Sequence, residues 1–261
     1  MFQLRKNSII SIFNILFLLM TEQEKNSIII IDKITKLENC ISTKKQLQII
    51  EEVAKEGEVG QQALFKLLVN RQIVKKTEIS YLDGFIFEIL QSTNIIKIKE
   101  QLHKSFNKGL IKLDTSLKNN YQPLQQLLIH QKFQEADKLT QIMLCKLAGL
   151  DENSKRNWLY FTDISLLPSE DLYTIDMLWR IYSRGKFGFS IQRKIWLANN
   201  YNWEKLWHKI GWKNQGTPCR YPNEFTWDIS APNGHLPLFN QLRGVQVLSA
   251  LFQHIVWNQS I

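Results

Sequence analysis

The sequence predicts an all-α protein, and three observations support that fold class. The chain of 261 residues has only 11 Gly and 6 Pro, too few for the many tight turns of an all-β fold. Its apolar residues recur every three or four positions in one segment after another, which is the spacing of amphipathic helices. A hydrophobic fraction of 44% with a charged fraction of 22% is ordinary for a soluble globular chain.

The first residues differ from the rest of the chain. Residues 9–20 form an almost continuous apolar run that follows Arg5 and Lys6. This run is too short for a membrane-spanning helix, and no small-residue cleavage site of a signal peptide follows it. We favour a translation start at Met20, with a weak membrane-facing segment as the alternative. Residues 1–26 are therefore treated as an N-terminal extension.

Residues 27–118 are expected to form a small bundle of short amphipathic helices that resembles a stack of HEAT repeats. Thr43 begins a capping-box pattern, an apolar face follows it, and Gly57 is expected to end that helix. Further helices are expected around 64–68 and 79–90, where Leu, Ile and Phe keep helical spacing. This unit has the composition of a scaffold without chemistry of its own.

A shift in composition divides the chain. All eight tryptophans lie between Trp158 and Trp257, and none precedes them. The polar segment 115–120 separates the two compositions, so we place the boundary there. The sequence thus predicts a helical bundle over 27–118 and a second domain over 119–261.

The second domain is also expected to be helical. Apolar residues at helical spacing predict helices near 124–128, 133–143, 169–182, 191–196, 203–212 and 242–255. The helix that follows Pro168 has the strongest start. Ser169 can cap its free amides, and the acidic Glu170 and Asp171 favour the positive end of its dipole.

An unusual segment lies before the last predicted helix. Four of the six prolines fall between Gly216 and Pro237, and proline at that density excludes a helix or a central strand. The same segment contains Tyr221, Phe225 and Trp227, which argues against a solvated, disordered linker. Structureless stretches longer than about 12–15 residues in a compact domain are usually functional or disordered. We therefore predict an ordered, functional loop lying over a helical base.

Charge and cysteine content limit the partners and the compartment. A net charge of +9 permits nucleic acid, an anionic membrane surface or an acidic small molecule as partner. Much of the excess is lysine on expected solvated helix faces, so charge alone does not select among the three. Cys40, Cys145 and Cys219 show no paired spacing, which favours a reducing compartment.

The sequence contains no pattern typical of a catalytic or metal site. Its five histidines have neither HExxH nor zinc-finger spacing. Asp228, Ser230 and His235 could be imagined as a hydrolase triad, but no Gly-x-Ser-x-Gly elbow presents the serine. A haem- or bilin-processing enzyme would have only His235 as a motif histidine. We therefore predict that the protein is not an enzyme, requires no cofactor and binds no metal.

Cations lie among aromatic residues in the second domain. The cations are Arg180, Arg184, Lys186, Arg193, Arg220 and Arg243, and the aromatics are Phe187, Phe189, Tyr221, Phe225 and Trp227. This combination suits a flat anionic ligand such as a porphyrin. The macrocycle gains from contact with flat apolar side chains, and its propionates pair with guanidinium groups. Single-stranded nucleic acid uses the same residue types, so composition leaves both ligand classes open.

Two long motifs resemble a known family. Residues 175–183 (IDMLWRIYS) and 185–192 (GKFGFSIQ) resemble its central signature, and residues 231–237 (APNGHLP) resemble its second hallmark. Gly211-Trp212 and the stretch 133–140 (FQEADKLT) also fit. The family is the genomes-uncoupled-four porphyrin-binding regulators of magnesium chelatase. The resemblance covers about residues 121–257, and the N-terminal bundle resembles the extra bundle of cyanobacterial and plastid-encoded members.

The resemblance implies a function. A "cupped hand" of helices would bind protoporphyrin IX or Mg-protoporphyrin IX, and would stimulate magnesium chelatase in chlorophyll biosynthesis by contacting its large porphyrin-binding subunit. The implied location is the plastid, either the stroma or the surface of the thylakoid or envelope. We expect a monomer, leave peripheral membrane association open, and expect no nucleic-acid partner. A basic helical nucleic-acid-binding module is the alternative.

The resemblance also implies the ligand-contact residues. The ligand would lie between the helical base and the loop 213–237. Asn240 and Arg243 would contact it, with Arg243 pairing with a propionate, and Trp158 and Phe161 would face the macrocycle from the other side. The loop would contribute Tyr221, Phe225, Trp227, His235 and Leu236. Some relatives have tryptophan at the position of Tyr221, so we expect weaker stacking there.

Overall fold

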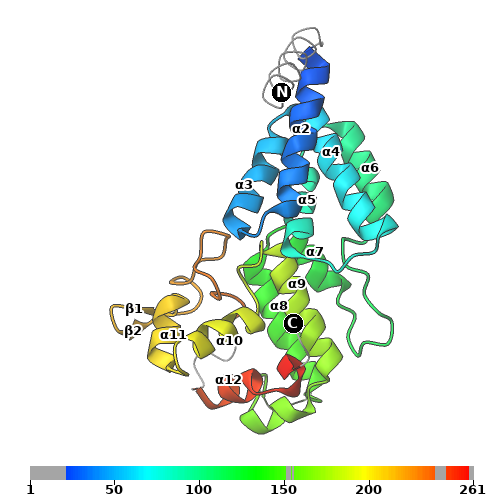
Figure 1. Ribbon diagram of the computed structural model, residues 1–261. Coiled ribbons are helices and arrows are strands. Elements are labelled where there is room, and N and C mark those ends of the chain that lie inside the picture. The colour runs from blue at the N-terminus through cyan, green and yellow to red at the C-terminus, as the bar shows by residue number, and fades with distance from the viewer. Residues whose placement is uncertain (1–21, 151–153, 155, 239–244, 259–261) are drawn as a thin grey trace. The chain divides into compact units, whose positions relative to one another are not determined.

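A computed structural model describes residues 22–150, 154, 156–238 and 245–258. Helices make up nearly all of the regular structure, which confirms the predicted all-α class (Figure 1). Among the described residues, the strands are limited to one small antiparallel hairpin. It pairs β1 (Lys213–Asn214) with β2 (Thr217–Pro218). Within the same ranges, no helix has the length and apolarity needed to cross a bilayer.

The chain forms two compact units. The first comprises the residues up to Thr77 together with Ile89–Ser105, and the second comprises Glu78–Glu88 and the chain from Phe106 onward. Helix α5 (Tyr81–Gln91) therefore belongs mainly to the second unit, although it lies between two helices of the first unit in the sequence.

The first unit is built from short helices. They are α2 (Glu22–Asn39), α3 (Thr43–Ala54), α4 (Gly57–Val69) with a following π-helical turn η1 (Asn70–Val74), and α6 (Ile96–Phe106). Helices α2, α3 and α4 pack against one another (Figure 1). Ile50, Val53, Leu64 and Leu68 are buried between them, at the helical spacing that the sequence predicted.

Two helix boundaries in this unit differ from the prediction. Thr43 is the first helical residue of α3 rather than its cap, and Ser42 precedes it without a side-chain capping bond. Gly57 does not end α3, which stops at Ala54; with a φ of +69° it begins α4. The positive φ explains why glycine stands here, because other residues rarely adopt that conformation. Glycine thus marks the break between the helices, but from its far side.

The second unit contains the remaining helices. They are α7 (Gln122–Ile129), α8 (Phe133–Leu147), η2 (Phe161–Leu166), α9 (Ser169–Tyr182), α10 (Phe189–Ala198), α11 (Trp203–Lys209), α12 (Val245–Phe252) and η4 (Ile255–Asn258). Ser169 is the first residue of α9 and not its cap, because Pro168 occupies the cap position. The predicted final helix 242–255 is shorter within the described residues: α12 ends at Phe252, and Ile255 belongs to a 3-10 turn.

The centre of the second unit lies between α8, α9 and the start of α10. Trp179 of α9 is fully buried, and its ring stacks on Phe133 with a centroid distance of 6.0 Å. Phe187 meets the edge of Phe133 at 5.3 Å. The indole Nε1–H of Trp179 donates a 3.0 Å hydrogen bond to Thr140 Oγ1, so the polar atom of this core tryptophan is satisfied. Aromatic packing thus fixes α8 against α9.

Helix α5 is joined to the second unit by close contact and by charge. An ideal Cβ at Gly84 would lie 2.0 Å from the carbonyl oxygen of Ile181, so only glycine lets the two backbones approach this closely. Arg184 binds Glu88 through two hydrogen bonds, Nε to Oε2 at 3.0 Å and Nη2 to Oε1 at 2.6 Å. The guanidinium also lies 4.3 Å from the centre of the Phe85 ring.

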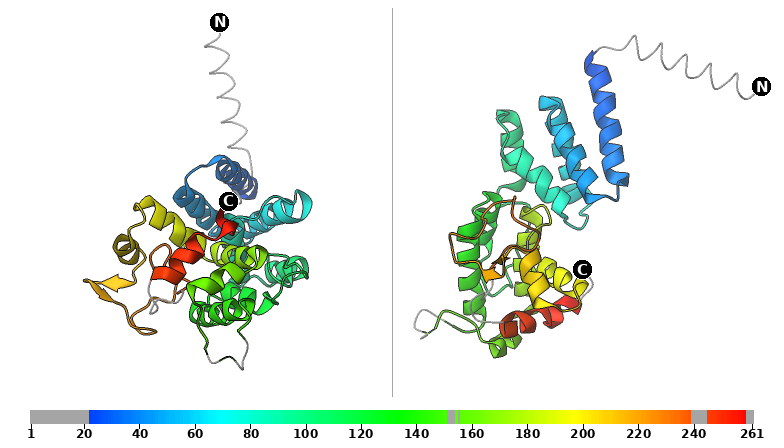
Figure 2. Two further views of the ribbon diagram at one scale, coloured as in Figure 1. Left: turned by 90° about the horizontal axis from the view of Figure 1, so that it is seen from below. Right: turned by 90° about the vertical axis from the view of Figure 1, so that its left-hand side faces the viewer.

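Helix α10 forms the base on which the proline-rich loop lies. It contacts α9, α11 and α12 (Figure 2). Helix α12 in turn packs against η2, which places the segment around residue 161 beside the last α-helix. Within the described residues, the predicted ligand contacts lie on the loop, on η2 and on the segment that leads into η2.

Candidate functional site

The proline-rich segment is an ordered loop, fastened to the start of α10 by hydrogen bonds. The fully buried side chain of Gln192 donates from Nε2 to the carbonyl oxygens of Gly234 at 3.0 Å and Pro237 at 2.9 Å. The amide of Gly188 donates to Leu236 O at 2.9 Å, and the amide of Gly234 donates to Lys186 O at 2.7 Å. Each bond satisfies a backbone group that an irregular segment cannot pair with itself.

The buried ring of His235 connects the end of the loop to its middle and to a residue before it through hydrogen bonds. Its Nδ1 lies 2.6 Å from the carbonyl oxygen of Ile210, and the amide of Thr226 donates to its Nε2 at 3.1 Å. These partners assign the proton to Nδ1 and leave Nε2 as acceptor, which is the neutral ring. Burial lowers the pKa of His235 accordingly. Since its ring is buried and both nitrogens are bound, His235 fastens the loop in this structure and does not face solvent.

Three aromatic residues predicted as ligand contacts gather in one cluster on the loop. Trp227 lies against Phe225 with a centroid distance of 6.3 Å and meets Tyr221 edge-on at 5.8 Å. Phe225 is buried against His235, whereas Tyr221 keeps 43% of its surface exposed. Trp227 is half-buried, and its Nε1–H donates to Pro222 O at 3.0 Å. The cluster therefore has a buried side at Phe225 and an open side at Tyr221 and Trp227.

The end of the loop is bound to α8 by a carboxylate. Leu238 N donates a 2.6 Å hydrogen bond to Oδ1 of Asp137. Asp137 is buried, and burial raises its pKa to about 7. Leu236, predicted as a ligand contact, is fully buried just before this point and contributes to the core. The predicted contacts Asn240 and Arg243 follow directly in the sequence and lie outside the described residues.

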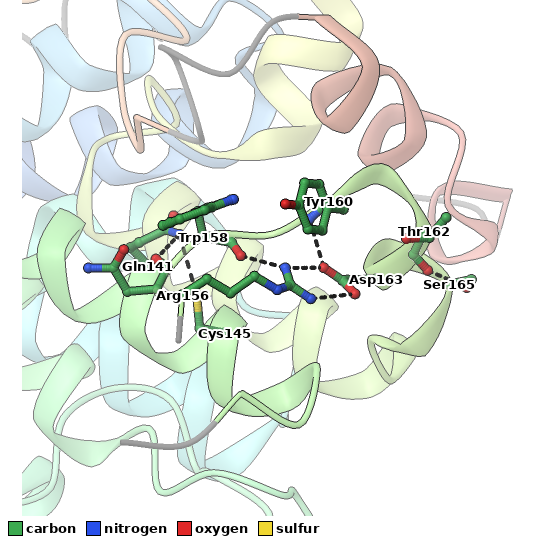
Figure 3. A network of polar contacts seen from close by, with 9 residues as sticks. Gln141, Cys145, Arg156, Trp158, Tyr160, Thr162, Asp163 and Ser165 are labelled. Atoms are coloured by element: carbon green, nitrogen blue, oxygen red, sulfur yellow. Dashed lines mark hydrogen bonds and ion pairs between the residues drawn. The ribbon is translucent and has the colours of Figure 1, made fainter. Parts of the chain in front are cut away.

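Trp158 lies on a second segment, which leads into η2, and Phe161 is the first residue of η2. Trp158 is half-buried, whereas Phe161 keeps 52% of its surface exposed. An ion pair organises this segment (Figure 3). Nη1 of Arg156 donates to Oδ2 of Asp163 at 2.6 Å, and its Nη2 donates to Oδ1 at 3.0 Å. The guanidinium holds the pKa of Asp163 below its usual range, so the pair is charged near neutral pH.

Most cations of the predicted cation and aromatic surface are bound within the fold. Arg180 pairs with Asp176 at 2.8 Å, and Arg184 pairs with Glu88. Arg193 Nε donates to Phe252 O at 2.7 Å, and Lys186 Nζ donates to Ile229 O at 2.5 Å. Arg180 lies 5.9 Å from the centre of the Tyr173 ring and Arg184 lies 4.3 Å from that of Phe85, and neither ring is among the aromatic residues grouped with these cations in the sequence. Arg184, Lys186 and Arg193 thereby join different segments of the fold, whereas the Arg180 pair lies within α9.

A pocket of about 360 Å³ lies at the N-terminal end of α9. It is lined by the segment 112–117 and by the first turns of α9, including Tyr173 and Met177. None of the residues predicted to contact a ligand lines this pocket. Within the described ranges, no group of three or more His, Cys, Asp and Glu side chains has the arrangement of a metal site.

Sequence reasoning missed Arg156, Asp163, Tyr160 and Asp137. Asp163 follows Tyr160 by three residues, the spacing at which a side chain can bind back to the first amide of a helix, and this signal was available. The bond between Asp137 and the amide of Leu238 could not be predicted, because the two residues are 101 positions apart in the sequence.

Comparisons with known proteins agree with the two-part organisation. A sequence model described as "GUN4-like" matches residues 114–255, and one described as "ARM-like repeat domain, GUN4-N terminal" matches residues 21–107. The second description agrees with the predicted stack of HEAT-like helices.

Relatives are found in red algae and plants. The chain is 52% identical over 225 residues to the ycf53 protein of Porphyra purpurea, covering 85% of this chain and 92% of that one. It is 36% identical over 140 residues to the chloroplastic tetrapyrrole-binding protein of Arabidopsis thaliana, covering 50% of this chain and 52% of that protein.

A solved structure is similar as well. The structure of GUN4 from Chlamydomonas reinhardtii superposes with a TM-score of 0.51 at 37% identity, covering 56% of this chain and 96% of that one. The resemblance noted in residues 175–192 and 231–237 is thereby confirmed. With the family's sequence model matching more than half of its length, the chain belongs to the GUN4-like family.

Proposed function

We propose that this protein binds a porphyrin, protoporphyrin IX or its magnesium form, on the second unit. The observation that carries the proposal is the similarity over 140 residues to the tetrapyrrole-binding protein of Arabidopsis thaliana. A family match over residues 114–255 accompanies that similarity, and it includes the loop, η2 and all of α12. The site would therefore be built from elements that the family shares.

Partly exposed aromatic side chains on two segments support a flat ligand. The loop presents Tyr221 and Trp227, the segment leading into η2 presents Trp158, and η2 itself begins with Phe161. Large exposed aromatic residues are costly to leave in water and often mark binding surfaces. A porphyrin macrocycle would gain free energy by covering such rings, because stacking adds to the burial of apolar area.

The alternative of a nucleic-acid-binding module has less support. Four of the cations that suggested it are bound to partners within the fold. A cation with an internal partner releases fewer counterions when a phosphate approaches, so little salt-dependent affinity is expected. Titrating the protein with deuteroporphyrin and with a single-stranded oligonucleotide at 50 and 200 mM salt distinguishes the two. We expect tight porphyrin binding that changes little with salt, and weak oligonucleotide binding. The reverse order of affinity would contradict the proposal.

A propionate partner is the sharpest element of the proposed site. The family resemblance assigns this role to Arg243. Arg243→Ala should weaken porphyrin binding about tenfold, since a charge-assisted, bidentate pair would be lost. Arg243→Lys keeps the charge without the planar fork and should lie between the two. The measurement is quenching of tryptophan fluorescence by deuteroporphyrin. Equal affinity of all three proteins would remove Arg243 from the site.

We further propose that porphyrin binding serves the regulation of magnesium chelatase in a plastid, and that the protein is not itself a catalyst. The chloroplastic relative in Arabidopsis thaliana supports the compartment, and the family resemblance supports the contact with the large chelatase subunit. Adding the protein to reconstituted chelatase should raise the rate of Mg-porphyrin formation, which fluorescence follows directly. The Arg243→Ala variant should raise it less. An unchanged rate with the unaltered protein would contradict the regulatory role while leaving porphyrin binding open to its own test.

A further inference from the structure

Tyr160 lies between the two aromatic residues that the family resemblance assigned to the ligand, Trp158 and Phe161. It precedes η2 as its N-terminal flanking residue and keeps 52% of its surface exposed. Tyr160 and Phe161 thus form two consecutive, half-exposed aromatic residues at the start of a 3-10 helix. Single exposed aromatics are common on protein surfaces, so exposure alone would not assign a role to Tyr160.

The backbone around Tyr160 is fixed more firmly than a surface segment requires. Nη1 of Arg156 donates at 2.7 Å to the carbonyl oxygen of Trp158, in addition to its bond with Asp163 (Figure 3). The amide of Tyr160 donates to Oδ2 of Asp163 at 2.7 Å, and the amide of Asp163 donates back to Tyr160 O at 3.1 Å. One ion pair therefore holds the chain on both sides of Leu159.

The ion pair that does this is sheltered from water. The side chains of Arg156 and Asp163 keep 22% and 12% of their surface exposed. Their contact is bidentate, which adds geometric definition to the attraction of charges. A bidentate, partly sheltered pair is more rigid than the solvent-exposed pairs that contribute little to stability. The segment from 158 to 163 is accordingly a preformed support.

The same guanidinium covers one face of the Tyr160 ring. Its central carbon lies 4.5 Å from the ring centroid, within the range of a cation–π contact. The cation side of the ring is therefore occupied, and the exposed surface of Tyr160 is available for another flat partner. A ring that is already oriented loses little conformational entropy when a ligand covers it.

We propose that Tyr160 is a further porphyrin-contact residue and that the Arg156–Asp163 pair is its positioning element. The macrocycle would cover the exposed surface of Tyr160 together with that of Phe161, while Arg156 supports the ring from the opposite side. This inference rests on the proposed porphyrin binding and adds a residue and a mechanism to that site. The pair acts through Tyr160 and does not itself touch the ligand.

The direct test removes the aromatic ring. Tyr160→Leu should weaken deuteroporphyrin binding about fivefold to tenfold, the loss expected for one aromatic stacking contact. Tyr160→Phe keeps the ring and should bind within about twofold of the unaltered protein, because the contact needs the ring and not the hydroxyl. Tyr173→Leu is the matched control. Tyr173 also has a guanidinium near its ring, that of Arg180 at 5.9 Å, but it lines the pocket at the N-terminal end of α9, away from the predicted ligand contacts. Its loss should therefore leave the affinity unchanged.

The positioning role needs a readout that simple destabilisation would not change. Asp163→Asn and Arg156→Lys should each weaken porphyrin binding, and each should also alter the Soret absorption band of the bound porphyrin, because the ring beside the macrocycle is no longer held. In a Tyr160→Leu background, Asp163→Asn should cause little further loss, since the residue it positions is already absent. Equal losses in both backgrounds would overturn the positioning role.

The outcomes separate this inference from the proposed function. If the unaltered protein binds deuteroporphyrin and Tyr160→Leu binds within twofold of it, Tyr160 is not a contact and the inference fails alone. If the unaltered protein does not bind, both the inference and the proposed function fail. Melting temperatures of the Tyr160 variants and the unaltered protein, measured without ligand, should agree within a few degrees, because the Tyr160 side chain is half-exposed and is not part of the core.

Discussion

At the scale of single residues, buried polar side chains hold the candidate site together. His235 joins the end of the loop to its middle and to the residues that precede it. Its ring bonds to Thr226 of the loop and to Ile210 before the loop, and its carbonyl oxygen accepts from Trp212 Nε1 at 2.8 Å. The family motif made His235 a candidate ligand contact. Its burial makes it a residue that shapes the loop on which other contacts stand.

Because the Thr226 amide donates to the neutral ring of His235, we expect the stability of the loop to depend on pH. Burial lowers the pKa of His235, so its stabilising contribution is complete above the unfolded pKa of about 6.5 and is lost as pH falls through the lower folded value. The hydrogen-exchange protection factor of the Thr226 amide should therefore fall between pH 7.5 and 5. His235→Ala should lower that factor about tenfold at neutral pH, because one hydrogen bond is removed. His254→Ala, which removes a histidine whose ring bonds Leu167 O, should leave it unchanged.

For Asp137 we expect the opposite dependence: the free energy of unfolding should fall, and not rise, with increasing pH. Burial raises its pKa to about 7, so the folded protein binds a proton that the unfolded chain releases near pH 4, and the free energy of unfolding falls as pH rises from 4 to 7. Lys138 opposes this shift, and the Tyr221 phenol also interacts with the carboxyl group. Asp137→Asn keeps an acceptor for Leu238 and should be more stable than the unaltered protein at pH 8, by on the order of 2–4 kcal/mol.

Urea unfolding at pH 5 and pH 8 measures the Asp137 effect. The difference between the two proteins should be small at pH 5 and large at pH 8. Asp137→Ala provides the control, since it leaves the Leu238 amide without an acceptor and should be less stable at both values. An Asp137→Asn variant that is less stable than the unaltered protein at pH 8 would show that the ionised carboxylate is needed.

At the scale of elements, local signals were predictable and pairings were not. Helical periodicity located α8, α9 and α10 because an apolar face is written in the sequence at a period of 3.6 residues. The caps at Thr43 and Ser169 were displaced by one residue, because a polar residue at a helix start fits both the cap and the first turn. The membership of α5 could not be predicted, since it depends on Arg184, which is 96 residues from Glu88.

Because α5 approaches α9 closely at Gly84, we expect the addition of one methyl group there to lower the stability of the protein. In Gly84→Ala the new Cβ would meet the carbonyl oxygen of Ile181 at 2.0 Å, so the two helices must separate. We expect the free energy of unfolding to fall by about 1–3 kcal/mol, the usual cost of overpacking. At an unconstrained helical position the same change would stabilise the protein by up to about 1 kcal/mol. Chemical denaturation measures the free energy of unfolding, and the sign of its change distinguishes the two cases. A stabilised variant would contradict the close packing.

At the scale of the whole molecule, the sequence predicted the helical class, the concentration of aromatics and the ordered loop. The cluster of Tyr221, Phe225 and Trp227 follows from their spacing within one loop. The support of Tyr160 by Arg156 and Asp163 could not be predicted in this way. Any sequence offers many possible acceptors for a guanidinium, and only the fold determines which of them it binds. For the same reason the sequence did not reveal that Arg180, Arg184, Lys186 and Arg193 bond to partners within the fold.

The central claim, that the second unit binds a porphyrin on its exposed aromatic residues, is tested most directly by titrating the full chain with deuteroporphyrin. Tryptophan fluorescence and the Soret band are recorded together. Because all eight tryptophans lie between residues 158 and 257, a porphyrin bound to this unit should quench the emission saturably and shift the Soret band at one equivalent. Emission that stays unchanged, or that declines in proportion to added porphyrin without saturation, would contradict the account.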